Sequence, residues 1–211
     1  MKEKFNSFSV PLALLDYINP ILYGITCYML IKYMKDSMLS PYHTLFIVGA
    51  VLSLLFGLVI PTGKLIVGLG IIKFRMPVIL VFLVNIGIFI SGMILFKTVF
   101  NVNAVLFFMI ILIAIILLIL FYLKNKKMNT IAVLTGALGY LLIYISLIIC
   151  SIHFHKIISI IFYCFAICLF IMLCGIGINA NLKNPKIHWI IEISNVICQL
   201  LVTTATILLF Q

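Results

Sequence analysis

The chain has 211 residues, of which 66% are hydrophobic and 9% are charged. Soluble domains contain roughly 45–50% apolar and about 25% charged residues, so a water-soluble fold of this size would lack the charged groups that cover its surface. The composition therefore excludes a soluble enzyme, a coiled coil, a disordered tail and a nucleic-acid-binding domain. It predicts a protein that lies within a lipid bilayer, in agreement with the mean hydropathy of +1.40.

Seven apolar stretches are long enough, at about 20 residues each, to cross a bilayer as helices. Their approximate ranges are 11–31, 43–60, 77–96, 104–123, 130–150, 157–178 and 188–210. Because the stretches are continuously apolar rather than alternating, they indicate helices and not the strands of a barrel. The predicted fold is an all-α, seven-helix transmembrane bundle that forms a single domain over residues 1–211.

The positions of the prolines support these boundaries. A proline is tolerated best at a helix end, where its missing N–H costs least. Five of the six prolines lie at or near predicted span ends: Pro11, Pro41, Pro61, Pro77 and Pro185. Only Pro20 lies inside a predicted span.

The net charge of +10 gives the orientation, because most of the 14 lysines and arginines lie between the apolar stretches. With seven spans, one side of the membrane carries ten of them: Lys2, Lys4, Lys64, Lys73, Arg75, Lys124, Lys126, Lys127, Lys183 and Lys186. The other side carries four: Lys32, Lys35, Lys97 and Lys156. Since cytoplasmic loops are the richer in Lys and Arg, we predict a cytoplasmic N-terminus and an external C-terminus in the plasma membrane, with the basic loops against anionic lipid.

The first span contains an acidic residue at a weakened turn. Asp16, Asn19 and Tyr23 share one helix face at i, i+3 and i+7. Pro20 has no N–H for the carbonyl of residue 16, so the helix is expected to be interrupted there. A broken helix with a carboxylate beside a freed carbonyl is a known way to build a cation or proton site in a membrane. No small-residue cleavage site follows, and we interpret this segment as a retained span rather than a signal peptide.

The second span has a face of small residues and is followed by a short apolar segment. Gly49, Ser53 and Gly57 recur every four residues, a pattern that allows close helix packing within the chain or between subunits. Residues 64–75 contain eight apolar residues between basic ones, too few to cross the membrane. We expect this segment to extend the second span or to form an interfacial helix, with a re-entrant segment as the alternative.

The seventh span carries a polar stripe on an otherwise apolar helix. His188, Glu192, Asn195 and Gln199 lie on one face at i, i+4, i+7 and i+11, and Thr203 continues it. Such a stripe is unfavourable against lipid and should face the interior of the bundle. The imidazole of His188 is placed to share a proton with Glu192.

The two intramembrane acids match in depth. Asp16 and Glu192 lie roughly 6–8 Å below the start of their spans, at 1.5 Å per residue, and both spans start on the cytoplasmic side. Because ionisable groups in spans are costly, they indicate function. The candidate solute- or ion-binding residues are Asp16, Asn19, Pro20, Tyr23, His188, Glu192, Asn195 and Gln199. The alternative is structural, since the helix dipole stabilises acids near a helix N-terminus and amides can join helices.

Other motifs point to no cofactor and no metal. The six cysteines include no CxxC pair and are interpreted as packing residues. A metal site of Cys150, His153 and His155 lacks an acidic partner. In the fifth span, Tyr140 and Tyr144 share a face, which suits either the core or the wall of a polar cavity.

Three functions remain open. The first is a small permease that moves a solute with a proton or cation through a site between the first and seventh spans. The second is a non-catalytic subunit of a membrane complex, with a membrane-protein partner or a second copy packed on the small-residue face. The third is an intramembrane lipid-active enzyme that uses Asp16, His188 and Glu192 for acid–base chemistry.

Overall fold

The computed structural model describes residues 9–71, 78–125, 128–179 and 185–211. Within these ranges the chain forms eight α-helices and one short 3₁₀ helix and no strand. The elements are α1 (Val10–Asp16), α2 (Ile18–Tyr33), η1 (Lys35–Ser37), α3 (Ser40–Gly68), α4 (Val78–Val99), α5 (Ala104–Asn125), α6 (Met128–His153), α7 (Ile157–Asn179) and α8 (Pro185–Phe210). The all-α fold expected from the sequence is therefore confirmed.

Helices α1 and α2 form one span that is interrupted at Tyr17. Pro20 lies in the first turn of α2, where its missing N–H leaves no hydrogen bond unmade within a helix. The side chain of Ser9 caps the start of α1 by accepting a hydrogen bond from the Leu12 N–H. The break occurs at the turn that Pro20 predicts, next to Asp16.

Six helices in the described ranges are long and apolar enough to cross a membrane: Val10–Tyr33, Ser40–Gly68, Ile79–Val99, Ile131–His153, Ile157–Ile176 and Lys186–Phe210. They correspond to six of the seven predicted spans. The remaining one, at 104–123, is the helix α5, whose side chains are described mainly over Ala104–Ile113, a stretch shorter than a span. A multi-pass membrane protein follows from these helices, whereas the seventh crossing stays a prediction.

Helix α3 is longer than predicted, and this corrects one boundary. It continues through Pro61 to Gly68, so Pro61 lies inside the helix and not at its end. The segment after Pro61 is thus an extension of the second span, one of the two arrangements expected for it. Residues 72–75, which complete the 64–75 segment, and the nearby Pro77 lie outside the described residues.

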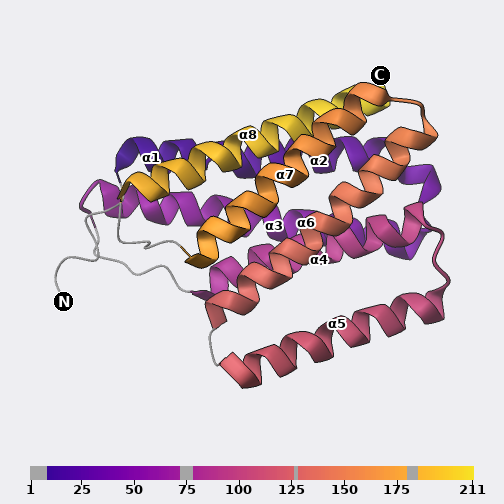
Figure 1. The fold of residues 1–211 in the computed structure, drawn as a ribbon, viewed down its shortest axis with the longest axis horizontal. Coiled ribbons are helices and arrows are strands. Elements are labelled where there is room, and N and C mark those ends of the chain that lie inside the picture. Colours follow the sequence, from indigo (N-terminus) through magenta and orange to yellow (C-terminus); the bar gives the residue numbers. More distant parts are fainter. Residues whose placement is uncertain (1–8, 72–77, 126–127, 180–184) are drawn as a thin grey trace.

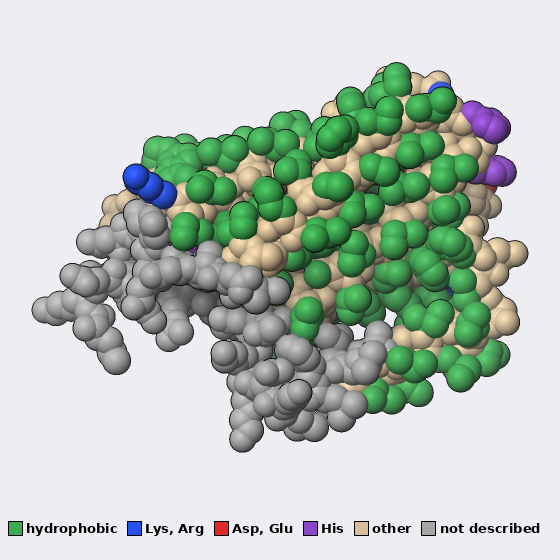
Figure 2. Space-filling model, in the orientation of Figure 1, with side chains coloured by type: hydrophobic (Ala, Val, Ile, Leu, Met, Phe, Trp, Pro, Cys, Tyr) green, Lys and Arg blue, Asp and Glu red, His purple; other side chains and the backbone are tan. Residues whose placement is uncertain are grey.

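The helices lie side by side along the long axis of the molecule (Figure 1). The first residues of α1 and α8 are at one end of the bundle, and the last residue of α8 is at the other; α5 lies at the edge and packs against α6. Figure 2 shows apolar side chains along the length of the helices on this face, with Lys side chains toward both ends and His side chains at one end. Such an apolar girdle with polar ends suits a bilayer.

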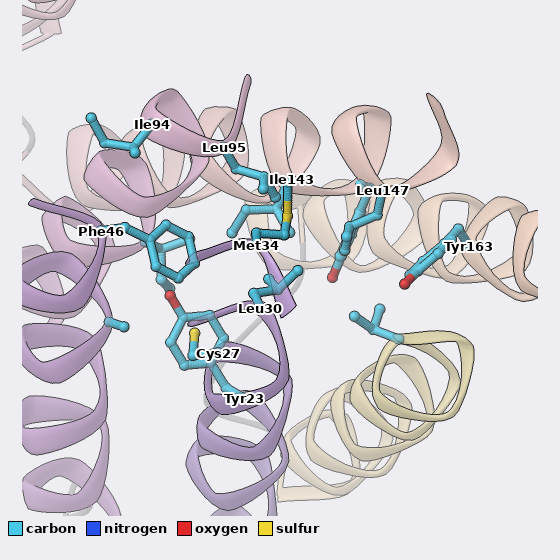
Figure 3. Close-up of a cluster of buried hydrophobic side chains, with 14 of the residues drawn as sticks. Tyr23, Cys27, Leu30, Met34, Phe46, Ile94, Leu95, Ile143, Leu147 and Tyr163 are labelled. Atoms are coloured by element: carbon cyan, nitrogen blue, oxygen red, sulfur yellow. The ribbon is translucent and has the colours of Figure 1, made fainter. Parts of the chain in front are cut away.

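The interior joins an apolar cluster to close contacts between helices at small residues. Side chains of α2, α3, α4, α6 and α7 meet in the cluster that Figure 3 shows, including Tyr23, Phe46 and Leu147. Beside it, the small-residue face of α3 packs against α4. A Cβ on Gly49 would lie 2.8 Å from the carbonyl oxygen of Gly87, so the two backbones approach closely.

Candidate functional site

Three charged side chains from three helices meet in the bundle. The Lys64 Nζ of α3 lies 2.7 Å from Asp16 Oδ2 of α1 and 2.7 Å from Glu192 Oε1 of α8. The side chains of Lys64, Asp16 and Glu192 are 17%, 13% and 10% exposed. We call this group the ion triad. One ammonium shared by two carboxylates leaves an excess charge of −1 when all three groups are ionised.

The ion triad brings together the two acids that the sequence placed at equal depth. The break at Tyr17 positions Asp16 at the last turn of α1, and Glu192 lies in the second turn of α8. Helices α1 and α8 are in direct contact, as the depth argument required. Both acids lie near the end of the bundle where their helices begin (Figure 1).

Lys64 is the functional residue that sequence reasoning missed. We expected Lys64 in a cytoplasmic loop because Pro61 was interpreted as the end of a span. In the structure α3 runs past Pro61, and Lys64 lies inside the helix, facing α1 and α8. The signal that could have found it is the apolar stretch of residues 65–68 directly after Lys64, because a lysine with apolar residues on both sides is an intramembrane ionisable group.

The polar stripe of α8 faces the bundle along its length. Glu192 pairs with Lys64, the Gln199 Nε2 lies 3.2 Å from the Tyr140 hydroxyl, and the Thr203 hydroxyl donates to the Leu22 carbonyl at 3.2 Å. Thr203 and Thr26 also share a hydrogen bond of 3.1 Å. The interior orientation predicted for the stripe is therefore present.

The proton sharing expected between His188 and Glu192 stays a prediction. His188 lies one turn before Glu192 on α8 and is half-buried. The partner that the structure gives the Glu192 carboxylate is the Lys64 ammonium, with an N–O distance of 2.7 Å. Spacing in the sequence did not indicate this ammonium as a neighbour of Glu192.

A cavity of about 230 Å³ adjoins the ion triad between α1, α2, α3, α4, α6, α7 and α8. Of the predicted solute-binding residues, the structure brings six to its wall: Asp16, Asn19, Pro20, Tyr23, Asn195 and Gln199. Ser53 and Gly57, expected to serve only in packing, line it as well. Gly57 is also close to Pro20, because a Cβ on Gly57 would lie 3.2 Å from the Pro20 Cβ.

Aromatic rings form the deep wall of this cavity. The ring centroid of Tyr140 lies 6.3 Å from that of Tyr23, 5.8 Å from that of Tyr144 and 5.4 Å from that of Phe170. All four residues line the cavity. The two tyrosines of α6 thus belong both to the core and to the cavity wall, since Tyr144 is buried, Tyr140 is partly buried against the core, and both line the cavity. Asn19 Oδ1 is buried and has no hydrogen-bond partner among the described residues.

The other motifs bring no further site together in the described part of the chain. Cys150 and His153 lie at the end of α6, and His155 lies in the link to α7 with a φ of 55°. The residues that the structure describes contain no group of three His, Cys, Asp or Glu side chains placed to hold a metal ion.

Comparison with known protein families, with curated proteins and with solved structures gives no match to this chain. The site is therefore interpreted from its geometry alone. What the geometry provides is a buried cluster of ionisable groups beside a cavity that is polar at one end and aromatic at the other.

Proposed function

We propose that this chain is a small permease of the plasma membrane, with seven spans, a cytoplasmic N-terminus and an external C-terminus. The observation that carries the proposal is the ion triad beside a cavity, with Asp16 in the cavity wall and polar side chains at that end. Charged side chains inside a bundle are costly, and where they adjoin a cavity they are typical of ion and substrate pathways. A protein that served only as a scaffold would have no need of the cavity beside them.

The orientation survives the correction at Lys64. With Lys64 removed from the loops, nine basic residues remain on the side of the N-terminus against four on the other, which still favours a cytoplasmic N-terminus. The ion triad and the start of α1 then lie near the cytoplasmic face. A solute would reach the cavity from that face and leave by a rearrangement of α1, α3 and α8, the three helices that the triad joins.

The triad supplies the coupling. Its excess negative charge lies in surroundings of low dielectric constant, where binding a proton or a cation is strongly favoured. Neutralising one carboxylate weakens the attraction of Lys64 for it, so binding would loosen the contact between α3 and one of its neighbours. The break at Tyr17 gives α1 the freedom to move relative to α2.

The experiment is solute-driven proton flux in liposomes. Purified wild-type protein is reconstituted with a pH-sensitive dye inside, and sugars, amino acids, amines and nucleosides are added one at a time. We expect one class to change the internal pH, with Glu192→Gln abolishing the response. Asp36→Asn is the matched control, because Asp36 is an exposed acid in η1, outside the bundle.

Two outcomes would contradict the proposal. A flux that persists unchanged in Glu192→Gln would remove the triad from the mechanism. A stoichiometric protein partner in native mass spectrometry of both wild type and Glu192→Gln, with no solute-driven flux, would instead identify an accessory subunit and make the polar stripe a packing feature.

A further inference from the structure

We propose that the cavity binds a small organic ammonium ion, with its charged group on Asp16 and its apolar body against the tyrosine and phenylalanine rings. This inference deepens the proposed function, because it takes the cavity as the solute site and names the class of solute. Three properties of the site lead to this inference: the charge of the lining, the aromatic rings of the cavity wall, and the Lys64 ammonium that lies between the two carboxylates.

The charge of the cavity favours a cation. Among the described residues that line it, Asp16 is the single charged one, and the others are amides, hydroxyls, aromatic rings, a thiol and aliphatic groups. Lys64 adjoins Asp16, but with all three groups ionised the triad carries an excess of one negative charge. An anion would meet this charge in a medium of low dielectric constant, whereas a monovalent cation would cancel it.

The wall favours an ammonium ion over a metal cation. Four aromatic rings, of Tyr23, Tyr140, Tyr144 and Phe170, suit an apolar body and attract a neighbouring positive charge through their faces. A divalent metal cation takes six or more oxygen ligands and is usually held by several carboxylates, whereas Asp16 is the one carboxylate among the described lining residues. The buried Asn19 Oδ1 is an acceptor without a partner among the described residues, and an ammonium group offers three N–H donors.

Lys64 shows that the carboxylates accept an alkylammonium group. Its side chain is a primary ammonium on an aliphatic stem, seated 2.7 Å from an oxygen of each acid. When a second ammonium binds Asp16, Lys64 retains Glu192, and each carboxylate then has one cation. With all groups ionised, two cations then balance the two carboxylates.

Asp16 is also on the correct side of the cavity for this arrangement. Tyr23 follows Asp16 by two helical turns, which is roughly 10 Å along the helix at 1.5 Å per residue. A ligand with its ammonium group at Asp16 therefore reaches the rings with a body of a few carbon atoms. The amide of Gln199 lies at the same end as the rings, where it donates toward the Tyr140 hydroxyl.

The test compares ligands that differ only in charge. Binding to purified wild-type protein in an uncharged detergent is measured by titration calorimetry for 2-phenylethylammonium, 2-phenylethanol and phenylacetate, which share one body. A second series uses n-butylammonium, 1-butanol and butyrate. We expect the better ammonium ion to bind at least tenfold more tightly than its alcohol, and the carboxylates not to bind.

Two variants link the preference to the triad. Asp16→Asn should reduce ammonium affinity to that of the alcohol, and Asp36→Asn should leave it unchanged. If Asp16→Asn does not fold, Glu192→Gln serves instead, because it also removes the excess charge and should weaken ammonium binding about tenfold. Equal affinity for ammonium and alcohol, tighter binding of the carboxylate, no binding of either ammonium ion, or an unchanged affinity in the acid variants would each overturn the inference.

The result separates this inference from the proposed function. Ammonium binding that depends on Asp16, without flux in liposomes, would support the ligand class and contradict transport. Flux of a neutral or anionic solute that depends on Glu192 would support transport and contradict the ligand class.

Discussion

The seam between α4 and α6 and the cavity where α2 faces α6 show two opposite ways of packing helices. At the seam, Gly92 and Gly139 let the backbones touch: a Cβ on Gly139 would lie 2.7 Å from both the Cα and the N of Phe89. At the cavity, Tyr23 and Tyr140 hold the helices apart with large side chains. The same bundle therefore has a rigid side and an open side.

This difference in packing assigns stability mainly to the α4–α6 contact and binding to the cavity. Without a hydrophobic drive between helices in lipid, close van der Waals packing of small residues is a main source of association. The seam between α4 and α6 provides this close packing. The bundle can therefore tolerate a cavity and buried charges between its other helices. Changes at the seam should act on folding, and changes at the cavity should act on binding with smaller effects on folding.

The largest effect is expected for Gly139→Ala. The new methyl group would meet the backbone of Phe89 and Ile88, which cannot rotate away, so α4 and α6 must separate. Overpacking of this kind costs typically 1–3 kcal/mol, and we expect about 3 kcal/mol in the free energy of unfolding in detergent because the obstacle is backbone.

The matched control is Gly175→Ala, since a Cβ at Gly175 meets no atom of the described residues within 4 Å beyond the backbone of its own helix. Alanine there should be neutral or stabilise α7 by roughly 0.5–1 kcal/mol, the ordinary helix preference for Ala over Gly. Equal effects of the two changes would show that the seam is not close-packed.

The next effect is expected for Lys64→Met. Removing the ammonium leaves Asp16 and Glu192 facing each other without a cation. Breaking a fully buried ion pair costs about 3–5 kcal/mol. The partial exposure of the triad lets water screen the two acids, so we expect a loss of about 2 kcal/mol in the free energy of unfolding. Lys32→Met, an exposed lysine at the end of α2, should change it by less than about 0.5 kcal/mol.

A triple variant sharpens this result. Asp16→Asn, Lys64→Met and Glu192→Gln together remove all three charges, and most of the stability lost in Lys64→Met should return. Recovery would show that the single change costs stability through unpaired charge. If the triple variant is less stable than Lys64→Met, the lysine acts through packing of its stem and the electrostatic account fails.

A smaller effect of the opposite sign is expected for Pro20→Ala. The new N–H at position 20 can donate to the Asp16 carbonyl, joining α1 and α2 into one helix. We expect a gain of about 1 kcal/mol in stability and a severalfold loss of ligand affinity, because Asp16 would turn away from Lys64. Pro11→Ala, at the first turn of α1, should change neither quantity. A loss of stability in Pro20→Ala would show that the packing of α1 and α2 against their neighbours requires the interruption at Tyr17.

Much of this arrangement was predictable because it follows from helical spacing. The stripe from Glu192 to Thr203 and the break beside Asp16 are local features that one helix dictates. Equal depth of Asp16 and Glu192 then indicated a shared site. These inferences needed no knowledge of which helices are neighbours.

Lys64 was not predictable by the same means, for two physical reasons. A proline normally ends a helix, yet Pro61 is followed by seven helical residues of α3. Membrane helices tolerate an internal proline when neighbouring groups satisfy the backbone carbonyl that it leaves without a hydrogen bond. The cavity wall depends on which side chains of α6 and α7 meet α2. Contacts between distant segments, such as that between Tyr140 and Phe170, cannot be read from spacing within one helix.

The smallest effect is expected for Thr203→Val, at the end of the stripe remote from the triad. Its hydroxyl donates to the Leu22 carbonyl and pairs with Thr26, so valine removes both hydrogen bonds at nearly constant volume. Hydrogen bonds between membrane helices contribute about 0.6 kcal/mol on average, and we expect a loss of roughly 1 kcal/mol in the free energy of unfolding for the two.

Thr204→Val is the matched control, because Thr204 is the adjacent residue and is exposed on the outer face of α8. It should leave the unfolding free energy unchanged or raise it slightly in lipid. Ligand affinity should be the same in both variants, since neither residue lines the main cavity. If Thr203→Val instead weakened ligand binding as strongly as Glu192→Gln, the stripe would act as one continuous pathway, and the division of the molecule into a packing part and a binding part would not extend to α8.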